Sequence, residues 1–340
     1  MADDTRYAYA VARIRGLETK LLDRQWIERL LAESAEGALK VLADSAFQEA
    51  VADVDRPEDL EPGLTRSLAE TMTTLTALAP EPEVIDLFRV RWDFRNLKSL
   101  TKASLLKLAD EDIGPAGEEI GLVDEVGTVP VTVLMKAVQD DDLVALPGVL
   151  VDAVRAAREA YRDSSELTVV DRAFDLAMWS HLLAAAEEHG DRFLRDYFRT
   201  EIDLLNLKAF IRIKEAGRDQ ADLQRVFIPG ARLDLSFFES HLSEPIDALV
   251  RRLEYGRYNR LAPVFREWTV ERAHTLELAC DNVLLDQIEQ AKTIAYGVEP
   301  LVAYMLLRQL EIKLVRAAMA AKLSGVSRAD VEARLRSVHV

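Results

Sequence analysis

The sequence predicts an all-α protein built from three similar helical units in a pseudo-threefold arrangement. Apolar residues recur at intervals of three and four along most of the 340-residue chain, as they do on one face of a helix. Glycine and proline are scarce, at 14 and 11 residues, whereas many short strands would need many turns. Three sequence features also recur in the same order three times, and such self-similarity is typical of repeat proteins.

Helical periodicity is clear near the start, in the middle and near the end of the chain. Examples are Leu17, Leu21, Leu22 and Trp26 to Leu31; Leu87, Val90, Phe94 and Leu97; and Leu301, Tyr304, Met305, Leu310 and Ile312. Proline and glycine predict breaks between helices at Asp55–Gly63, Ala79–Glu83, Ile113–Gly121, Gly127–Pro130, Pro147–Gly148, Ile228–Gly230 and Ala262–Pro263. The best strand candidate, Val126–Val133, contains Pro130. We therefore expect a turn there that leads into a helix at Thr132–Val138.

The repeated features define the predicted units. The pattern V-[DE]-R-A-x-x-L occurs at residues 170–176 and 270–276, with a looser copy at 11–17. A second signature on a helix occupies residues 93–98, 203–208 and 308–313, and a glycine-containing turn follows at 127–134, 229–235 and 324–331. We expect units at 1–150, with an insertion, at 151–255 and at 256–340.

The second signature places an i,i+3 polar pair on one helix face: Asp93 and Asn96, Asp203 and Asn206, Arg308 and Glu311. In the middle copy the pair lies among apolar residues, so we expect it to be half-buried and hydrogen-bonded to a neighbouring helix. Arg308 and Glu311 are spaced to form an ion pair within their helix.

The opposite face of this helix carries recurrent basic residues. Lys98, Lys208 and Lys313 occupy one repeat position, and Arg212 follows Lys208 by four residues. We regard these four as candidate contacts with an acidic partner. The alternative is that they are solvated side chains in local ion pairs.

Composition and charge exclude several function classes. The net charge of −16 argues against nucleic-acid binding, which depends on Lys and Arg at the phosphates. The single cysteine, Cys280, excludes an internal disulfide and multi-cysteine metal sites, and its apolar surroundings predict a buried side chain. The N-terminal sequence MADDTRYAYA lacks the basic start of a signal peptide, and the longest uncharged run, Leu176–Ala186, is too short to span a bilayer. We expect a cytoplasmic protein without a transmembrane segment.

No sequence motif indicates catalysis. The five histidines are scattered without metal-ligand spacing, and the sequence contains no G-x-x-x-x-G-K-[ST], G-x-G-x-x-G or G-x-S-x-G motif. We therefore expect no catalytic residue, no bound metal or cofactor, and no nucleotide binding.

Three segments carry a family resemblance. Residues 296–313, continuing to 321–325, resemble the C-terminal signature of the C-subunit family of V-type/A-type ATPases (ATP synthases), which is related to the d subunit of the eukaryotic V-ATPase. Residues 193–212 and 7–17 resemble its middle and N-terminal signatures. The resemblance implies a funnel-shaped, non-catalytic rotor subunit of the central stalk. Such a subunit receives the central shaft, sits on the cytoplasmic face of the membrane rotor ring, and couples ATP synthesis or hydrolysis to proton or sodium transport.

Two other functions remain open at this point. A helical-repeat adaptor with an unrelated partner would share the fold, the charge and the lack of catalytic motifs. A helical enzyme with a carboxylate site would need acidic residues clustered in a cleft with shifted pKa values.

Overall fold

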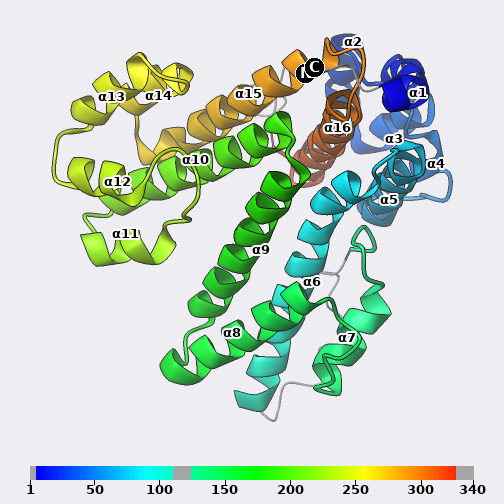
Figure 1. Cartoon of the computed structure of the whole chain (residues 1–340). Helices are drawn as coiled ribbons and strands as arrows, with labels where there is room; N and C mark the ends of the chain where they lie inside the picture. The colour runs from blue at the N-terminus through cyan, green and yellow to red at the C-terminus, as the bar shows by residue number, and fades with distance from the viewer. Residues whose placement is uncertain (1–4, 110–123, 327–340) are drawn as a thin grey trace. The chain divides into compact units, whose positions relative to one another are not determined.

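Every regular element in the computed structural model is a helix (Figure 1), and the structure describes residues 5–109 and 124–326. The predicted all-α class is therefore confirmed. The long helices are α5 (Glu61–Leu78), α6 (Glu83–Ala109), α8 (Gly148–Ser164), α9 (Leu167–His189), α10 (Arg192–Glu215), α15 (Ala273–Lys292) and α16 (Glu299–Leu323).

Shorter helices connect these long ones. The α-helices are α1 (Ala8–Glu18), α2 (Arg24–Ala32), α3 (Ala35–Ala43), α4 (Gln48–Val51), α7 (Val131–Gln139), α11 (Gln220–Val226), α12 (Leu235–Leu242), α13 (Ile246–Glu254) and α14 (Ala262–Arg266). The 3₁₀ helices are η1 (Thr5–Tyr7), η2 (Pro57–Asp59), η3 (Asn259–Leu261) and η4 (Val270–Arg272).

Local sequence accounts for several helix ends. Asp23, Ser34 and Asp191 cap α2, α3 and α10 by accepting hydrogen bonds from backbone N–H groups of the first turn. Gly190 ends α9 with a φ of +74°, the left-handed conformation that glycine adopts at low cost.

The predicted helix breaks agree with the structure at most described positions, and two need correction. The expected break at Ala262–Pro263 lies inside α14, which begins at Ala262 and has Pro263 in its first turn. The expected break at Asp55–Gly63 ends earlier, because α5 begins at Glu61 and contains Pro62 and Gly63 in its first turn. Proline is favoured there, since a first-turn N–H has no partner within the helix. The expected break at Ile113–Gly121 lies outside the described residues.

The chain divides into two compact units. One contains the described residues of 1–85 and 245–340, and we call it the terminal unit; the other contains those of 86–244, and we call it the central unit. This division follows packing, whereas the predicted units at 1–150, 151–255 and 256–340 follow sequence repetition and stay a prediction.

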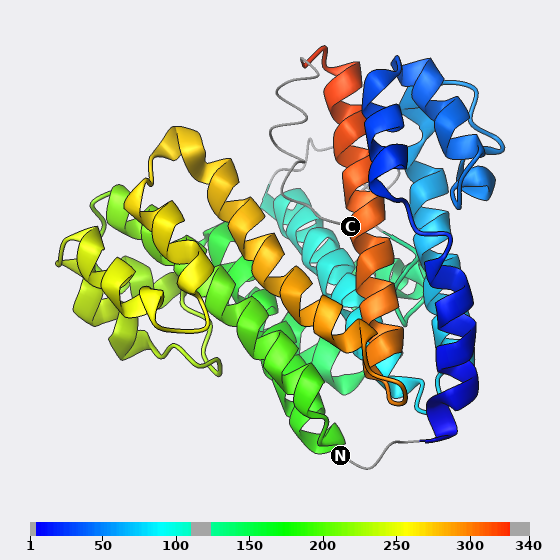
Figure 2. The ribbon, with the colours of Figure 1, turned by 90° about the horizontal axis from the view of Figure 1, so that it is seen from above.

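In the terminal unit the two ends of the chain pack side by side. Helix α16 lies against α1, α5 and α15, and Figure 2 shows α16 beside the N-terminal helix α1. Leu301, Val302 and Met305 on α16 are fully buried, together with Ile14 of α1 and Leu75 of α5. Burial of each such side chain contributes roughly 1.5–3 kcal/mol to folding.

In the central unit α8 packs along α9, and α9 packs against α10. Phe88 of α6 contacts Tyr197 and Phe198 of α10, with ring centroids 5.9 and 5.2 Å apart. Helices α11 and α12 pack on α10, with Phe238 of α12 against Phe210. This packing fixes α6 and α10, two of the helices that carry the repeated polar pair.

Candidate functional site

The polar pair of α10 holds the turn that follows this helix. Asp203 and Asn206 are 0 and 3 % exposed. The Asn206 side chain exchanges two hydrogen bonds with Ile228, donating to its carbonyl at 2.8 Å and accepting from its N–H at 2.9 Å. The Asp203 carboxylate accepts from the backbone N–H groups of Arg232 and Leu233 at 3.3 and 2.8 Å. Two side chains thus satisfy four backbone groups of residues 228–233.

The pair on α6 makes the same pattern. Asn96 exchanges two hydrogen bonds with Asp124, at 2.9 and 3.0 Å. Asp93 accepts from the N–H groups of Thr128 and Val129 at 2.9 and 3.1 Å, and from the Thr128 hydroxyl at 2.6 Å. Burial raises the pKa of Asp93, and the hydrogen bonds from Thr128 and Val129 partly offset this rise.

This geometry corrects the prediction for the middle pair and extends it to α6. Asp203 and Asn206 are fully buried rather than half-buried, and their partners lie in a turn rather than on a neighbouring helix. A turn needs such partners because its backbone N–H and C=O groups lack the regular hydrogen bonds that a helix provides. In the α6 copy the turn approaches the helix closely, since a Cβ on Gly127 would lie 2.0 Å from Asp93 Oδ1.

The third pair, on α16, is built differently. Arg308 and Glu311 form the expected ion pair within the helix, at 2.5 Å, and both are buried. Arg308 also donates to the Ser67 hydroxyl at 3.1 Å and stacks on Phe47. Glu311 accepts from the backbone N–H of Leu22 at the other end of the chain. Burial raises the pKa of Glu311, although Arg308 acts in the opposite direction.

The turn at 324–331, which follows the third pair in the predicted repeat, lies mostly outside the described residues. Gly325 ends α16 with a φ of +67°. In the described part of the terminal unit, the turn that bonds the third pair is the one before α2, at Leu22.

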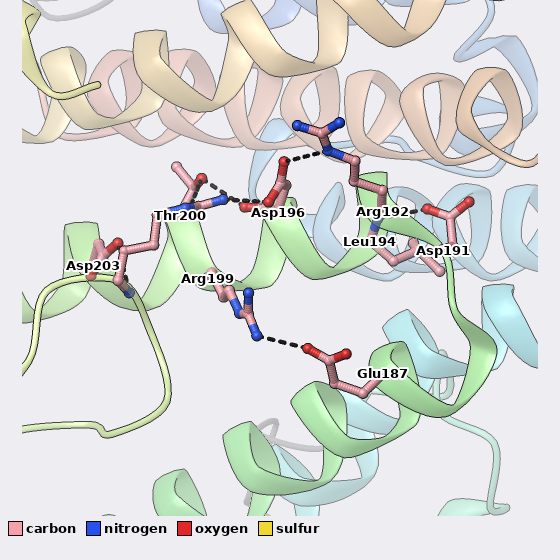
Figure 3. Close-up of polar contacts among 9 residues, drawn as sticks. Glu187, Asp191, Arg192, Leu194, Asp196, Arg199, Thr200 and Asp203 are labelled. Carbon is pink, nitrogen blue, oxygen red and sulfur yellow. Dashed lines mark hydrogen bonds and ion pairs between the residues drawn. The ribbon is translucent and has the colours of Figure 1, made fainter. Parts of the chain in front are cut away.

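A polar network surrounds the start of α10 (Figure 3). Asp191 caps the helix by accepting from the Leu194 N–H at 2.9 Å, and Arg199 pairs with Glu187 at 2.7 Å. Asp196 pairs with Arg232 at 2.6 Å, and Arg232 also donates to the Thr200 hydroxyl. The contacts of Arg232 with Asp196 and Thr200 therefore hold the 228–233 turn on α10, in addition to the hydrogen bonds from Asn206. This part of the network has a structural role.

Two of the predicted contact residues form ion pairs inside the chain. Lys98 pairs with Asp175 of α9 at 2.9 Å, and the neighbouring Lys102 pairs with Asp171. Lys313 pairs with Asp281 of α15 at 2.8 Å, although its side chain is 65 % exposed. Arg91, which also lies on α6, pairs with Glu201 and lies over the Trp179 ring.

The other two candidates lie on α10, where Lys208 is half-buried and Arg212 is exposed. Both have interactions within the chain, so neither is a free cation. Lys98, Lys208 and Arg212 belong to the central unit, and Lys313 belongs to the terminal unit.

The remaining chemistry-bearing side chains are dispersed. Within the described ranges, no group of three His, Cys, Asp or Glu residues is placed to hold a metal ion. Cys280 is buried in α15, as expected, and His181 packs against Phe94 with ring centroids 6.3 Å apart. None of the helices in residues 5–109 and 124–326 has the length and apolar character that crossing a bilayer requires.

A cavity of about 300 Å³ in the terminal unit carries mixed charge. Its lining includes Lys20, Glu49, Glu70, Tyr304 and Arg308. The Arg308 guanidinium in this lining is already paired with Glu311, and Glu49 and Glu70 balance the remaining positive charge, so the cavity has no net positive charge to bind phosphate.

Comparison with known proteins places these observations in a family. The family described as ATP synthase (C/AC39) subunit matches the chain over residues 10–334. The chain is similar to the C subunit of the V-type sodium ATPase of Enterococcus hirae, with 24 % identity covering 96 % of this chain and 97 % of that protein. It is also similar to the C subunits of the A-type ATP synthases of Thermococcus kodakarensis and Methanothermobacter thermautotrophicus. Their identities are 24 and 26 %, covering 92 and 90 % of this chain and 86 and 81 % of those proteins.

Proposed function

The chain belongs to the ATP synthase (C/AC39) subunit family, and from that premise we propose that it is the non-catalytic coupling subunit of a rotary ATPase. In this role it connects the central shaft of the ATP-handling head with the membrane rotor ring. It works on the cytoplasmic face of the membrane and is held there by its partner subunits.

The observation that carries the proposal is that the family match covers residues 10–334. The Enterococcus C subunit is likewise covered over 97 % of its length. A match of this extent includes all three helices that carry the repeated polar pair. It therefore favours a subunit of the ATPase over a helical adaptor with an unrelated partner.

A non-catalytic role is consistent with the residues. The sequence lacks the phosphate-binding loop G-x-x-x-x-G-K-[ST], in which backbone N–H groups cradle phosphates. The buried polar pairs are used within the chain, where they stabilise turns. Transmission of torque needs a stiff body, and fully satisfied buried hydrogen bonds stiffen a helical fold.

We keep Lys98, Lys208, Arg212 and Lys313 as proposed contacts with the shaft. Lys313 has the strongest support, because its side chain stays largely exposed while paired with Asp281. Reversing Lys98, Lys208 and Lys313 to glutamate should weaken shaft binding, and the loss should shrink as ionic strength rises. Equal binding by the triple variant and the wild type at low ionic strength would show that the three lysines do not contact the shaft.

The proposed function is tested by affinity purification from the organism's own membranes. A tagged chain, produced at its native level, is recovered after mild detergent solubilisation, and the co-purifying proteins are identified by mass spectrometry. We expect head, shaft and ring subunits of one rotary ATPase in fixed ratios. Recovery of an unrelated partner without ATPase subunits would support the adaptor function instead.

Loss of the gene provides the functional half of the test. Membranes without the chain should lose ATP-driven ion transport, while their detached heads still hydrolyse ATP. Adding back the purified chain should restore transport. Unchanged transport in its absence would contradict the proposed coupling role.

A further inference from the structure

Helix α13 and the turn after it carry an exposed basic surface with an aromatic residue at its centre. Leu249, Val250 and Leu253 bury one side of α13. The opposite side presents Arg251 and Arg252, followed by Tyr255 at the helix end and Arg257 in the turn. We call these four residues the α13 basic surface; Figure 1 marks α13 in yellow.

The three arginines of this surface differ from their neighbours in their pairing. Arg260 pairs with Asp286 at 3.0 Å, Arg272 pairs with Glu267 at 2.7 Å, and Arg266 pairs with Glu254. Arg251, Arg252 and Arg257 have no ion-pair or hydrogen-bond partner in the part of the chain that the structure describes. Glu254, the nearest acidic residue in sequence, is already bound by Arg266.

Stabilisation of the end of α13 explains only part of this arrangement. Basic residues in the last turn of a helix interact favourably with its free carbonyl groups, which accounts for Arg251 and Arg252. It does not account for Arg257, beyond the helix, or for Tyr255, which is 94 % exposed. Arginine and tyrosine are enriched where proteins bind one another, because each offers both apolar area and hydrogen bonds.

We propose that the α13 basic surface binds an acidic segment of another protein of the complex; this inference rests on the proposed function. The guanidinium group of arginine binds a carboxylate through two parallel hydrogen bonds, and the tyrosine ring supplies apolar contact. In a chain of net charge −16, three arginines that lack a partner among the described residues and adjoin the exposed Tyr255 give this surface a local positive charge, which complements an acidic partner. A protein partner fits better than anionic lipid. Lipid-binding segments usually carry four to eight basic residues, and the net charge of the chain opposes an anionic membrane.

The surface is tested by rebinding to membranes that lack only this chain. The triple variant Arg251→Glu, Arg252→Glu and Arg257→Glu is compared with the wild type. A matched control, Lys136→Glu, Arg155→Glu and Arg162→Glu, makes the same change in net charge at exposed residues of the central unit. We expect the first variant to bind roughly tenfold more weakly at low ionic strength, with a smaller difference at high ionic strength. The control should bind like the wild type.

A cross-linking measurement identifies the partner. Replacement of Tyr255 by p-benzoylphenylalanine in the assembled complex should capture, on illumination, an Asp- and Glu-rich peptide of an ATPase subunit. Circular dichroism checks that the variants fold. If the Arg→Glu triple variant does not fold, the triple variant with glutamine at the same three positions replaces it. Its binding and the cross-link then test the proposed acidic partner.

The outcomes separate this inference from the proposed function. The inference is overturned if both triple variants bind like the wild type, or if both lose binding equally. A lipid interaction would also overturn the inference. In that case the cross-link would capture lipid, and phosphatidylglycerol vesicles would bind the wild type but not the first variant. Failure of the wild type itself to rebind would instead contradict the proposed function.

Discussion

At the scale of single residues, the protein uses buried side chains as partners for turn backbone. Asn206 donates to the carbonyl of Ile228 and accepts from its N–H, and an amide can do both because it carries an NH₂ group and a carbonyl oxygen. Asp203 serves two donors, which suits a carboxylate. The Asp and Asn of the repeated signature are thus explained by the hydrogen-bonding capacity of each side chain rather than by chemistry on a substrate.

Asn206→Leu should destabilise the central unit by about 2–4 kcal/mol. Leucine is similar in size but leaves the Ile228 N–H and carbonyl without partners, and each buried unpaired group costs about 1–3 kcal/mol. Urea unfolding followed by circular dichroism measures the change. The control is Gln139→Leu, at an exposed amide, which should change stability by less than about 0.5 kcal/mol. Equal effects of the two substitutions would show that the bonds to Ile228 contribute nothing.

We expect His181 to make the free energy of unfolding sensitive to acid. Burial lowers the pKa of His181 in the folded state, so below the unfolded pKa of about 6.5 the unfolded chain binds more protons. The contribution of His181 to stability is therefore present above about pH 6.5 and is lost as the pH falls through the folded-state pKa. His181→Gln should flatten the fall in unfolding free energy over this range, whereas His274→Gln, at an exposed position, should leave it unchanged. An unaltered slope in the His181 variant would contradict the assignment.

The sequence was sufficient to place the polar pairs but not their partners. Helical periodicity puts Asp203 and Asn206 on one face, since that depends only on spacing within α10. Their partners lie 22–30 residues further along the chain, and the partner of Glu311 lies 289 residues away. Contacts of that range depend on packing, for which a single sequence gives no direct signal. The recurrent lysines were recognised as a pattern, while Asp175 and Asp281, which pair with two of them, were not.

At the scale of helices, close approach of backbones decides which positions accept a side chain. Gly63 of α5 faces the end of α4, and a Cβ at this position would lie 1.8 Å from the carbonyl oxygen of Ala50. Gly16 in α1 has open space around the same position. Glycine is thus needed for close helix packing in α5 but not in α1.

Gly63→Ala and Gly16→Ala should change stability in opposite directions. The first forces α4 and α5 apart and should cost about 1–3 kcal/mol, as overpacking does. The second replaces glycine by alanine at an exposed helix position and should stabilise the protein by up to about 1 kcal/mol. Thermal unfolding of the two single variants tests both signs. Stabilisation by Gly63→Ala would show that α4 and α5 do not approach as described.

At the scale of the whole molecule, the terminal unit is assembled from both ends of the chain. Leu22 donates to Glu311, the Arg15 guanidinium bonds the carbonyl of Ile294, and Lys322 bonds the carbonyl of Leu31. Each of these contacts joins segments more than 270 residues apart in sequence. Cooperative units of this kind open together when a shared buried contact is lost.

Glu311→Gln should therefore weaken both chain ends at once. The substitution leaves the buried Arg308 without its counter-ion, and breaking a buried ion pair in this way costs about 3–5 kcal/mol. In native-state hydrogen exchange, amides of α1 and α16 should lose protection by the same free energy, while those of α8 and α9 serve as the internal reference. Glu289→Gln, at an exposed position of α15, is the control and should leave both ends unchanged. Loss of protection in α16 with α1 unaffected would mean that the two ends open independently, and the terminal unit would not be one cooperative body.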